Sequence, residues 1–336
     1  MPAASKLEVA LRGNPSPTSS LRPLTLFALL ARQTGTLTGC PVNAQCNHAT
    51  THNVFLHLFT LNVLFKLIVS VGYHMSRLGI IDTHAHLDDN RFDSDRAAVM
   101  ERLANDMEAV ITQGTTYESS VASVNMAEQY DFVYAAVGWH PEDLAGIKDE
   151  SYIAELERLA REHTKVVAIG EIGLDYYWKE NEPKEVQLLR LKQQCDLAYS
   201  LDLPVVIHNR EAHGDCLNFF QNEVPKELKV VFHCYSGSLE MAKELWKRGY
   251  YLGFGGTSTY KNNKKVREVL AACPEELFIL ETDCPYLAPE PFRGRRNDPS
   301  LTEYVAKNAA LVRGTSFEHI AEQTTKNARM LFNKMK

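Results

Sequence analysis

Short runs of apolar residues recur along the chain after residue 75, and polar segments separate them. The runs are rich in Val and Ile and lack strict alternation with polar residues, which is typical of strands buried on both faces of a parallel sheet. Eight such runs predict strands at 78–81, 109–112, 133–137, 166–169, 204–207, 230–232, 250–253 and 277–280.

Amphipathic helical patterns lie between most of these runs, for example at 95–105, 151–163, 184–201 and 238–248. Eight strands alternating with helices over about 260 residues predict an α/β fold of the (β/α)8 TIM-barrel type. A doubly wound open sheet is the alternative. Two extra C-terminal helices are expected at 301–312 and 317–332, and Thr315 or Ser316 can cap the second.

Residues 1–74 differ from the rest of the chain in composition, and become strongly apolar from Val54 to Tyr73. Lys66 argues against a membrane span, since a Lys near the bilayer centre costs about 3 kcal/mol. A targeting peptide is the second interpretation, and a mis-annotated start upstream of Met75 is the third, which we favour. We therefore expect 1–74 to be an extension outside the fold, disordered or removed, and 75–336 to form the barrel domain.

The composition is that of a globular protein, with 45% apolar and 23% charged residues, which excludes collagen-like and low-complexity classes. Seven scattered cysteines without a CxxC pair argue against a cysteine zinc site and suit a reducing, cytoplasmic location. Residues 75–336 hold 31 basic and 41 acidic residues, a net charge of −10. A polyanionic substrate would therefore need local cations or metal ions at its binding site. No stable membrane association is expected for this part of the chain.

Acidic and imidazole side chains follow five of the eight predicted strands. Active sites of TIM barrels form at the C-terminal ends of the strands, so these side chains are expected to meet there. They lie in the segments 82–86, 170–175, 208–210, 233–237 and 281–283.

His84 and His86 point to the same side of an extended chain, because strand side chains alternate. A pair of surface histidines is the alternative for this short motif. These two histidines and the other strand-end groups give six candidate metal ligands. Six are too many for one tetrahedral catalytic zinc with an open position. Six ligands suit two ions that share a bridging carboxylate. The six are His84, His86, Glu171, His208, His233 and Asp283.

The motifs resemble those of the TatD family of metal-dependent hydrolases, among the amidohydrolase-like barrels. The matching stretches are IDTHAHL at 81–87, GWHP at 138–141, GEIGLD at 170–175, LPVVIHNR at 203–210, HCYSG at 233–237, ETDCPYL at 281–287 and RGRRN at 293–297. The resemblance covers 75–336 and leaves 1–74 without a counterpart.

The resemblance implies a divalent-metal-dependent hydrolase of phosphodiester bonds, of the deoxyribonuclease type and with the 3′–5′ exonuclease polarity. His84, His86 and Asp283 would hold one cation, His208 and His233 a second, and Glu171 would bridge both. A hydroxide between the ions would attack phosphorus. Nitrogen and oxygen ligands do not distinguish Zn, Mn, Mg, Co and Ni.

Asp283 is expected to orient the attacking water and accept its proton, beside the bridging Glu171. His140 is the first candidate for a phosphate contact, with a purely structural histidine as the alternative. Arg210 can clamp a phosphate with its paired donors, or pair with Glu142 or Asp175 and hold the loop.

A basic cluster precedes Asn297, and either attracts phosphate or forms a solvated turn. It consists of Arg293, Arg295 and Arg296. The aromatic residues 176–178 either stack on a base or pack in the core. The expected partner is DNA or another nucleic-acid phosphodiester. Hydrolysis of carboxylic esters or amides, such as mischarged aminoacyl-tRNA, is the alternative activity, and a non-enzymatic metal-bound scaffold is a third interpretation.

Overall fold

Eight strands pair side by side in sequence order, and every pairing is parallel. The computed structural model describes residues 79–335. The strands are β1 (Ile81–Ala85), β2 (Ala109–Gln113), β3 (Val133–Val137), β4 (Val166–Asp175), β5 (Val205–Arg210), β6 (Val230–Phe232), β7 (Tyr251–Phe254) and β8 (Phe278–Leu280).

The sheet closes into a ring through contacts between β1 and the chain at and after β8. Thr83 donates its hydroxyl to the carbonyl of Leu280 at 3.0 Å, and the Asp283 amide donates to the His84 carbonyl at 2.8 Å. A parallel bridge joins Ala85 to Cys284. These contacts confirm the (β/α)8 barrel and exclude the open sheet.

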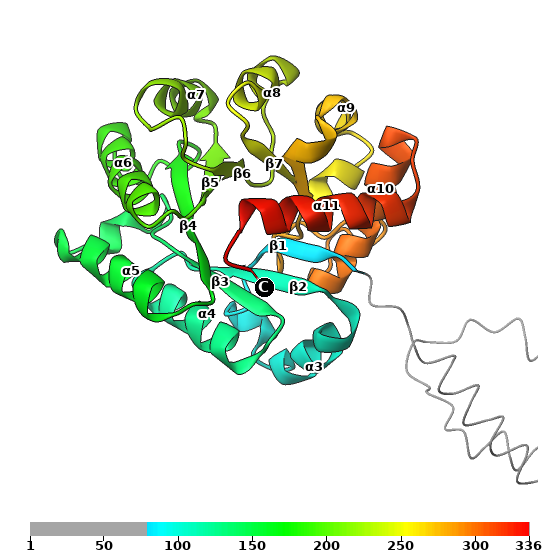
Figure 1. Ribbon diagram of the computed structural model, residues 1–336, viewed down its shortest axis with the longest axis horizontal. Coiled ribbons are helices and arrows are strands. Elements are labelled where there is room, and N and C mark those ends of the chain that lie inside the picture. The colour runs from blue at the N-terminus through cyan, green and yellow to red at the C-terminus, as the bar shows by residue number, and fades with distance from the viewer. Residues whose placement is uncertain (1–78, 336) are drawn as a thin grey trace, which may run out of the picture. The chain divides into compact units, whose positions relative to one another are not determined.

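Helices surround the ring of strands on its outside, and the last of them lies across one end of the ring (Figure 1). They are α3 (Arg96–Asp106), α4 (Tyr117–Gln129), α5 (Ser151–Glu162), α6 (Lys184–Ser200), α7 (His213–Asn222), α8 (Leu239–Trp246), α9 (Lys264–Ala272), α10 (Thr302–Arg313) and α11 (Phe317–Leu331). Ser316 caps α11, because its hydroxyl accepts a hydrogen bond from the His319 amide at 3.1 Å. The two extra C-terminal helices are therefore confirmed.

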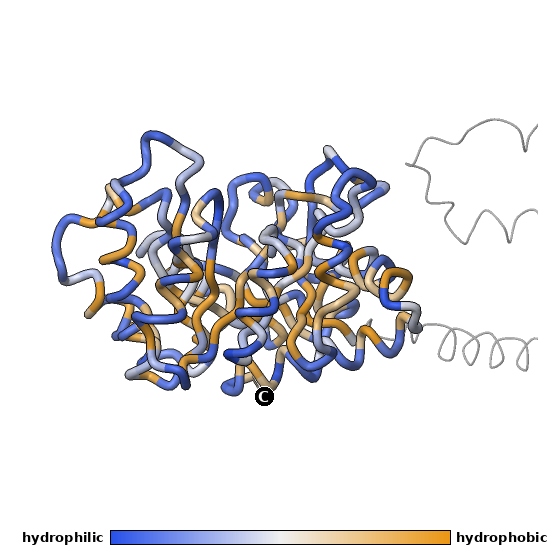
Figure 2. The backbone as a smooth tube through the Cα atoms, turned by 90° about the horizontal axis from the view of Figure 1, so that it is seen from above, coloured by the Kyte–Doolittle hydropathy of each residue, from blue (hydrophilic) through white to orange (hydrophobic). Residues whose placement is uncertain are grey.

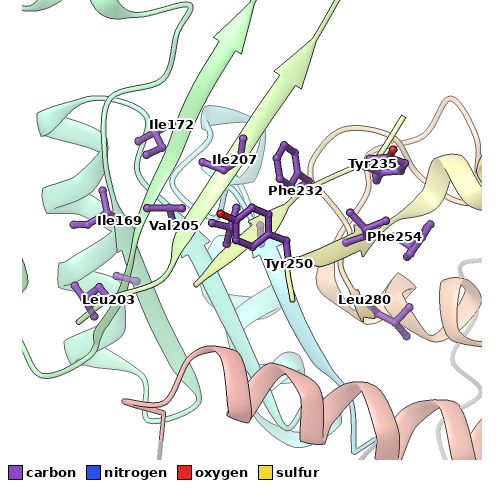
Figure 3. Close-up of a cluster of buried hydrophobic side chains, with 14 of the residues drawn as sticks. Ile169, Ile172, Leu203, Val205, Ile207, Phe232, Tyr235, Tyr250, Phe254 and Leu280 are labelled. Carbon is purple, nitrogen blue, oxygen red and sulfur yellow. The ribbon is translucent and has the colours of Figure 1, made fainter. Parts of the chain in front are cut away.

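An outer hydrophobic core fills the space between strands and helices. Side chains of alternate strand residues supply it, including Ile207 on β5, Phe232 on β6 and Leu280 on β8 (Figure 3). Hydrophobic segments accordingly concentrate in the middle of the barrel, with hydrophilic ones at its periphery (Figure 2). The strands are covered by helices on one face and enclose the barrel interior with the other. Burial on both faces is the reason that the strands carry continuous apolar runs.

A second, smaller core fills the interior of the barrel. The intervening strand residues point into it, for example Ile111, Val206 and Ile279. Phe332 and Met335, at and beyond the end of α11, pack against these residues. The Asn327 amide donates to the carbonyl of Phe278 at 2.8 Å, where β8 begins. Helix α11 therefore closes the N-terminal end of the barrel, and a ligand must enter from the opposite end.

Three strands continue well past the ends that the apolar pattern predicts. β1 continues through Ala85 instead of ending at Ile81, β4 continues through Asp175 instead of ending at Ile169, and β5 continues through Arg210. The polar residues expected to follow these strands therefore belong to them, except His86, which directly follows β1. The prediction for 1–74 lies outside the described residues, and the first predicted strand, 78–81, lies partly outside them. No helix within 79–335 is long and apolar enough to cross a membrane.

Candidate metal centre

A cavity of about 670 Å³ opens at the C-terminal end of the strands, and the predicted site residues meet there. Five of the six predicted ligands line it, and the sixth, His84, is buried directly behind them. The structure therefore brings together residues that are up to 199 positions apart, from His84 to Asp283.

One group of ligand atoms forms where β1 ends. His84 Nε2 and His86 Nε2 are 3.3 Å apart, and they lie 3.7 and 3.4 Å from Asp283 Oδ1. Ligands bound at about 2.1 Å to one tetrahedral ion lie about 3.4 Å from each other. Glu171 Oε2 adds a fourth atom, 3.3 Å from His84 Nε2 and 3.5 Å from His86 Nε2. The spacing of this group fits one cation.

A second group surrounds the other oxygen of Glu171. Oε1 lies 2.7 Å from His233 Nε2 and 3.0 Å from His208 Nδ1, and these two nitrogens are 3.3 Å apart. Glu171 thus presents one carboxylate oxygen to each group. That division is the geometry that a carboxylate shared by two ions requires.

Both candidate ligand carboxylates are ionised despite their burial. Burial alone would raise the pKa of Glu171, but the nearby imidazoles, with His233 and His140 foremost, hold it well below its ordinary value. Burial likewise opposes ionisation of Asp283, while the hydrogen bond with His86 lowers the pKa of Asp283. Two buried negative charges surrounded by imidazoles are a donor set that suits divalent cations.

The imidazoles divide into protonated and neutral ones. Burial opposes protonation of His86, but Asp283 and Glu171 raise its pKa to about 9. The pKa of His208 is also raised to about 9, because hydrogen bonds to carboxylates outweigh burial. Burial lowers the pKa of His84 to about 4. Burial opposes protonation of His233 too, but Glu171 raises its pKa. At neutral pH the imidazolium charges of at least His86 and His208 therefore face the two carboxylates, and a metal ion must displace those protons.

Metal binding at pH 7 should therefore release protons from the histidine ligands, at least those of His86 and His208. The affinity should rise as pH increases toward 9, since fewer protons then compete with the metal. Calorimetric titration with Mn²⁺ in buffers of different ionisation enthalpy would count the protons. Binding without proton release would contradict the assignment of these two histidines as ligands.

Asp175 holds His208 from behind. Its Oδ2 lies 2.9 Å from His208 Nε2, and its other oxygen accepts the amide of Tyr177 at 2.9 Å. Gln187 binds the Asp175 backbone on both sides, by accepting from its amide and donating to its carbonyl. Because the carboxylate fixes the Nε2 proton, the Nδ1 lone pair of His208 is left for a metal ion.

Glu281 occupies a similar place behind His233, with Oε1 3.9 Å from His233 Nδ1. Burial raises the pKa of Glu281 to about 7. The sequence pattern predicted no role for Glu281. For Asp175 it predicted only a pairing with Arg210. Strand periodicity contains a signal for Asp175, since Glu171, Gly173 and Asp175 alternate onto one face of β4.

Gly173 permits β4 to approach β5 closely beside this histidine. Its φ is +150°, and a Cβ at this position would lie 1.9 Å from the carbonyl oxygen of His208. Gly173 pairs directly with His208 in the strand register. A larger residue would therefore displace the strand that carries a candidate ligand.

His140 lines the cavity, as expected of a phosphate contact, but it also faces Glu171. Its Nδ1 accepts the Glu142 amide at 3.2 Å, so that Nε2 is the ring nitrogen left to donate. Nε2 lies 3.3 Å from Glu171 Oε1. His140 is therefore placed as a hydrogen-bond donor to the shared carboxylate.

Arg210 lines the cavity, whereas the basic cluster does not. Arg210 lies over the Tyr177 ring at 3.9 Å, and among the described residues no ion pair joins it to Glu142 or Asp175. Two members of the basic cluster are engaged elsewhere. Arg296 pairs with Asp95 at 2.6 Å, and Arg293 lies 4.3 Å over the Tyr260 ring. Arg295 is exposed. A phosphate contact by this cluster stays a prediction. It would require a substrate that extends beyond the cavity.

The family model described as TatD related DNase matches residues 81–333. The metal-dependent hydrolase YabD of Bacillus subtilis is 42% identical over 254 residues, which cover 75% of this chain and 98% of YabD. The metal-dependent hydrolase TatD of Mycobacterium tuberculosis is 35% identical over 261 residues, 75% of this chain and 97% of the relative. Both are described as uncharacterised.

Solved structures of TatD-family proteins have the same fold as this chain. The crystal structure of the TatD homologue YjjV from Escherichia coli superposes with a TM-score of 0.70 at 33% identity, over 76% of this chain and 98% of that one. A TatD-family hydrolase from Entamoeba histolytica, 23% identical, shares the fold with a TM-score of 0.68 over 75% of this chain and 97% of its own. From the family match, the relatives and the barrel with its His, Glu and Asp clusters, we conclude that this chain belongs to the TatD family of metal-dependent hydrolases.

Proposed function

We propose that this protein hydrolyses phosphodiester bonds of DNA, as a 3′–5′ exonuclease that uses two divalent cations. The observation that carries the proposal is the division of the Glu171 carboxylate between two groups of ligand atoms. His84, His86 and Asp283 would hold one cation, His208 and His233 the other, and Glu171 both. Two such ions supply the positive charge that activates water and stabilises phosphoryl oxygens.

The protein's own groups complete the reaction. Asp283 borders the cavity with an ionised carboxylate and would accept a proton from the attacking water. The His140 imidazole holds the shared carboxylate through its Nε2 proton. Arg210 would bind a phosphate oxygen with its donor edge.

The charge of the cavity supports two ions as the main attraction for phosphate. Six acidic side chains line it, and Arg210 is the one Lys or Arg among its described lining residues. A polyanion would be repelled by such a site in the absence of bound cations. The cavity volume of about 670 Å³ suits the end of a chain, since pockets for small ligands span about 300–1,000 Å³. The 3′–5′ polarity rests on the family resemblance.

The proposal is tested with the full chain, Mn²⁺ or Mg²⁺, and a single-stranded oligonucleotide labelled at its 5′ end. We expect stepwise shortening from the 3′ end. His208→Ala should lose more activity than the roughly 10–100-fold typical of changes behind a metal ligand. His163→Ala is the matched control, because His163 lies outside the cavity beside Glu128. Hydrolysis of aminoacyl-tRNA without cleavage of DNA would overturn the proposal in favour of an esterase.

A further inference from the structure

Two adjacent aromatic side chains are exposed at the rim of the metal cavity. Tyr177 is 51% and Trp178 45% exposed, and their rings contact each other edge to face, with centroids 4.7 Å apart. They follow β4, and Trp178 lines the cavity. Of the two expectations for this segment, core packing therefore fails for both residues, whereas Tyr176 packs against the outer core.

Arg210 lies between these rings and the candidate metal ligands. Its guanidinium lies 3.9 Å from the Tyr177 centroid and 5.5 Å from that of Trp178. It is two residues beyond His208 on β5, so strand alternation directs both side chains to the same face. Asp175, which precedes the aromatic segment, pairs with Arg210 in the β4–β5 register. We call Tyr177, Trp178 and Arg210 the stacking platform.

The chemistry of the platform matches one nucleotide. Aromatic and guanidinium planes bind the face of a base, and the arrangement tolerates every base because each has a π-face. The guanidinium donors, unpaired with any carboxylate in the described chain, remain free for a phosphate.

We propose that the stacking platform is a nucleotide subsite, on which the base next to the scissile phosphate stacks on the ring of Trp178, while the perpendicular Tyr177 ring supports Trp178 and Arg210 from the side. This inference rests on the proposed phosphodiesterase function and specifies how the substrate is selected: the enzyme recognises a nucleotide with an unstacked base, and not the phosphodiester group alone.

Two chromogenic phosphodiesters separate base recognition from phosphodiester chemistry. They are thymidine 5′-(p-nitrophenyl phosphate), which has a base, and methyl p-nitrophenyl phosphate, which has none. Trp178→Ala should lower kcat/KM for the thymidine substrate about 5- to 150-fold, the range of one base–aromatic stack, and leave the methyl substrate nearly unchanged. Tyr199→Ala is the matched control, since Tyr199 on α6 is also 49% exposed but lies outside the cavity lining.

Tryptophan fluorescence tests the same subsite without turnover. Stacking of thymidine 5′-monophosphate on Trp178 should quench the wild-type protein and the Tyr199→Ala variant, but not Trp178→Ala, which retains the buried Trp139 and the partly buried Trp246. Equal losses on both substrates, or quenching that survives Trp178→Ala, would overturn the subsite while leaving phosphodiesterase activity intact. Conversely, Trp178-dependent quenching in a protein that hydrolyses neither chromogenic substrate nor the labelled oligonucleotide would support the subsite and refute the proposed function.

Discussion

Asp283→Asn is expected to keep most of its bound metal and to lose about 10²- to 10⁴-fold in turnover, the usual range for a general base. The Asn side chain retains one oxygen that can bind a cation but cannot accept a proton at neutral pH. In the native protein the carboxylate is ionised, because the hydrogen bond with His86 holds its pKa below the ordinary value against the effect of burial. Metal content by mass spectrometry, measured beside phosphodiester turnover, separates the two functions.

His233→Ala provides the contrast, since this residue would serve only as a ligand. We expect this variant to lose metal and to recover part of its activity in excess Mn²⁺. If Asp283→Asn instead turns over at a near-normal rate with full metal occupancy, Asp283 is not the base. The role of proton acceptor would then pass to another group, such as Glu171.

Glu171→Gln should have the second large effect, the loss of metal from both groups of ligands. Glu171 is the residue whose two oxygens reach both groups, with 3.3 Å to His84 and 2.7 Å to His233. Gln removes the negative charge that offsets two cations, and turns one of the two oxygens into a nitrogen donor. We expect metal titration to show much weaker binding of both ions, and activity to fall below that of Asp283→Asn.

Glu281→Gln is the matched control for this change. Glu281 is equally buried and lies near the same centre, but it faces His233 from behind at 3.9 Å. It should keep both ions with an affinity reduced by no more than about 10–100-fold. Wild-type affinity for both ions in Glu171→Gln would show that the carboxylate does not bridge them.

Apolar runs located seven of the eight strands because each strand is buried on both sides, by the interior of the barrel and by the outer helices. The first run, 78–81, shares only Ile81 with β1. The same signal misplaced strand ends. β4 continues past Ile169 to Asp175 because its last residues pair with β5, and their polarity hides this from a pattern based on hydrophobicity. The cap of α11 was predictable to within one residue, since Ser316 acts locally on the amide of His319.

The candidate ligands were recognisable because each lies at or near the end of an apolar run, and parallel strands bring such ends to one edge. The structure brings all six together, while their roles as ligands stay predictions. Proximity to Glu171 was not readable for His140, because it depends on how the loop after β3 folds over the barrel. The basic cluster before Asn297 was a candidate for phosphate binding because of its charge alone. In the structure Arg296 pairs with Asp95, which is 201 residues away in the chain.

The sequence by itself determined the alternation of strands and helices and the set of acids and imidazoles at the strand ends. These features follow from local periodicity and from residue type. Closure of the sheet into a barrel was decided by the contacts of β1 with the chain at and after β8. Only the tertiary structure decided which oxygen of Glu171 faces which histidines, that Asp175 holds His208, and that Arg210 lies on Tyr177. Such contacts depend on strand register and on side-chain rotamers set by neighbours far away in the chain. A one-residue shift of register would turn His208 and Arg210 away from the cavity.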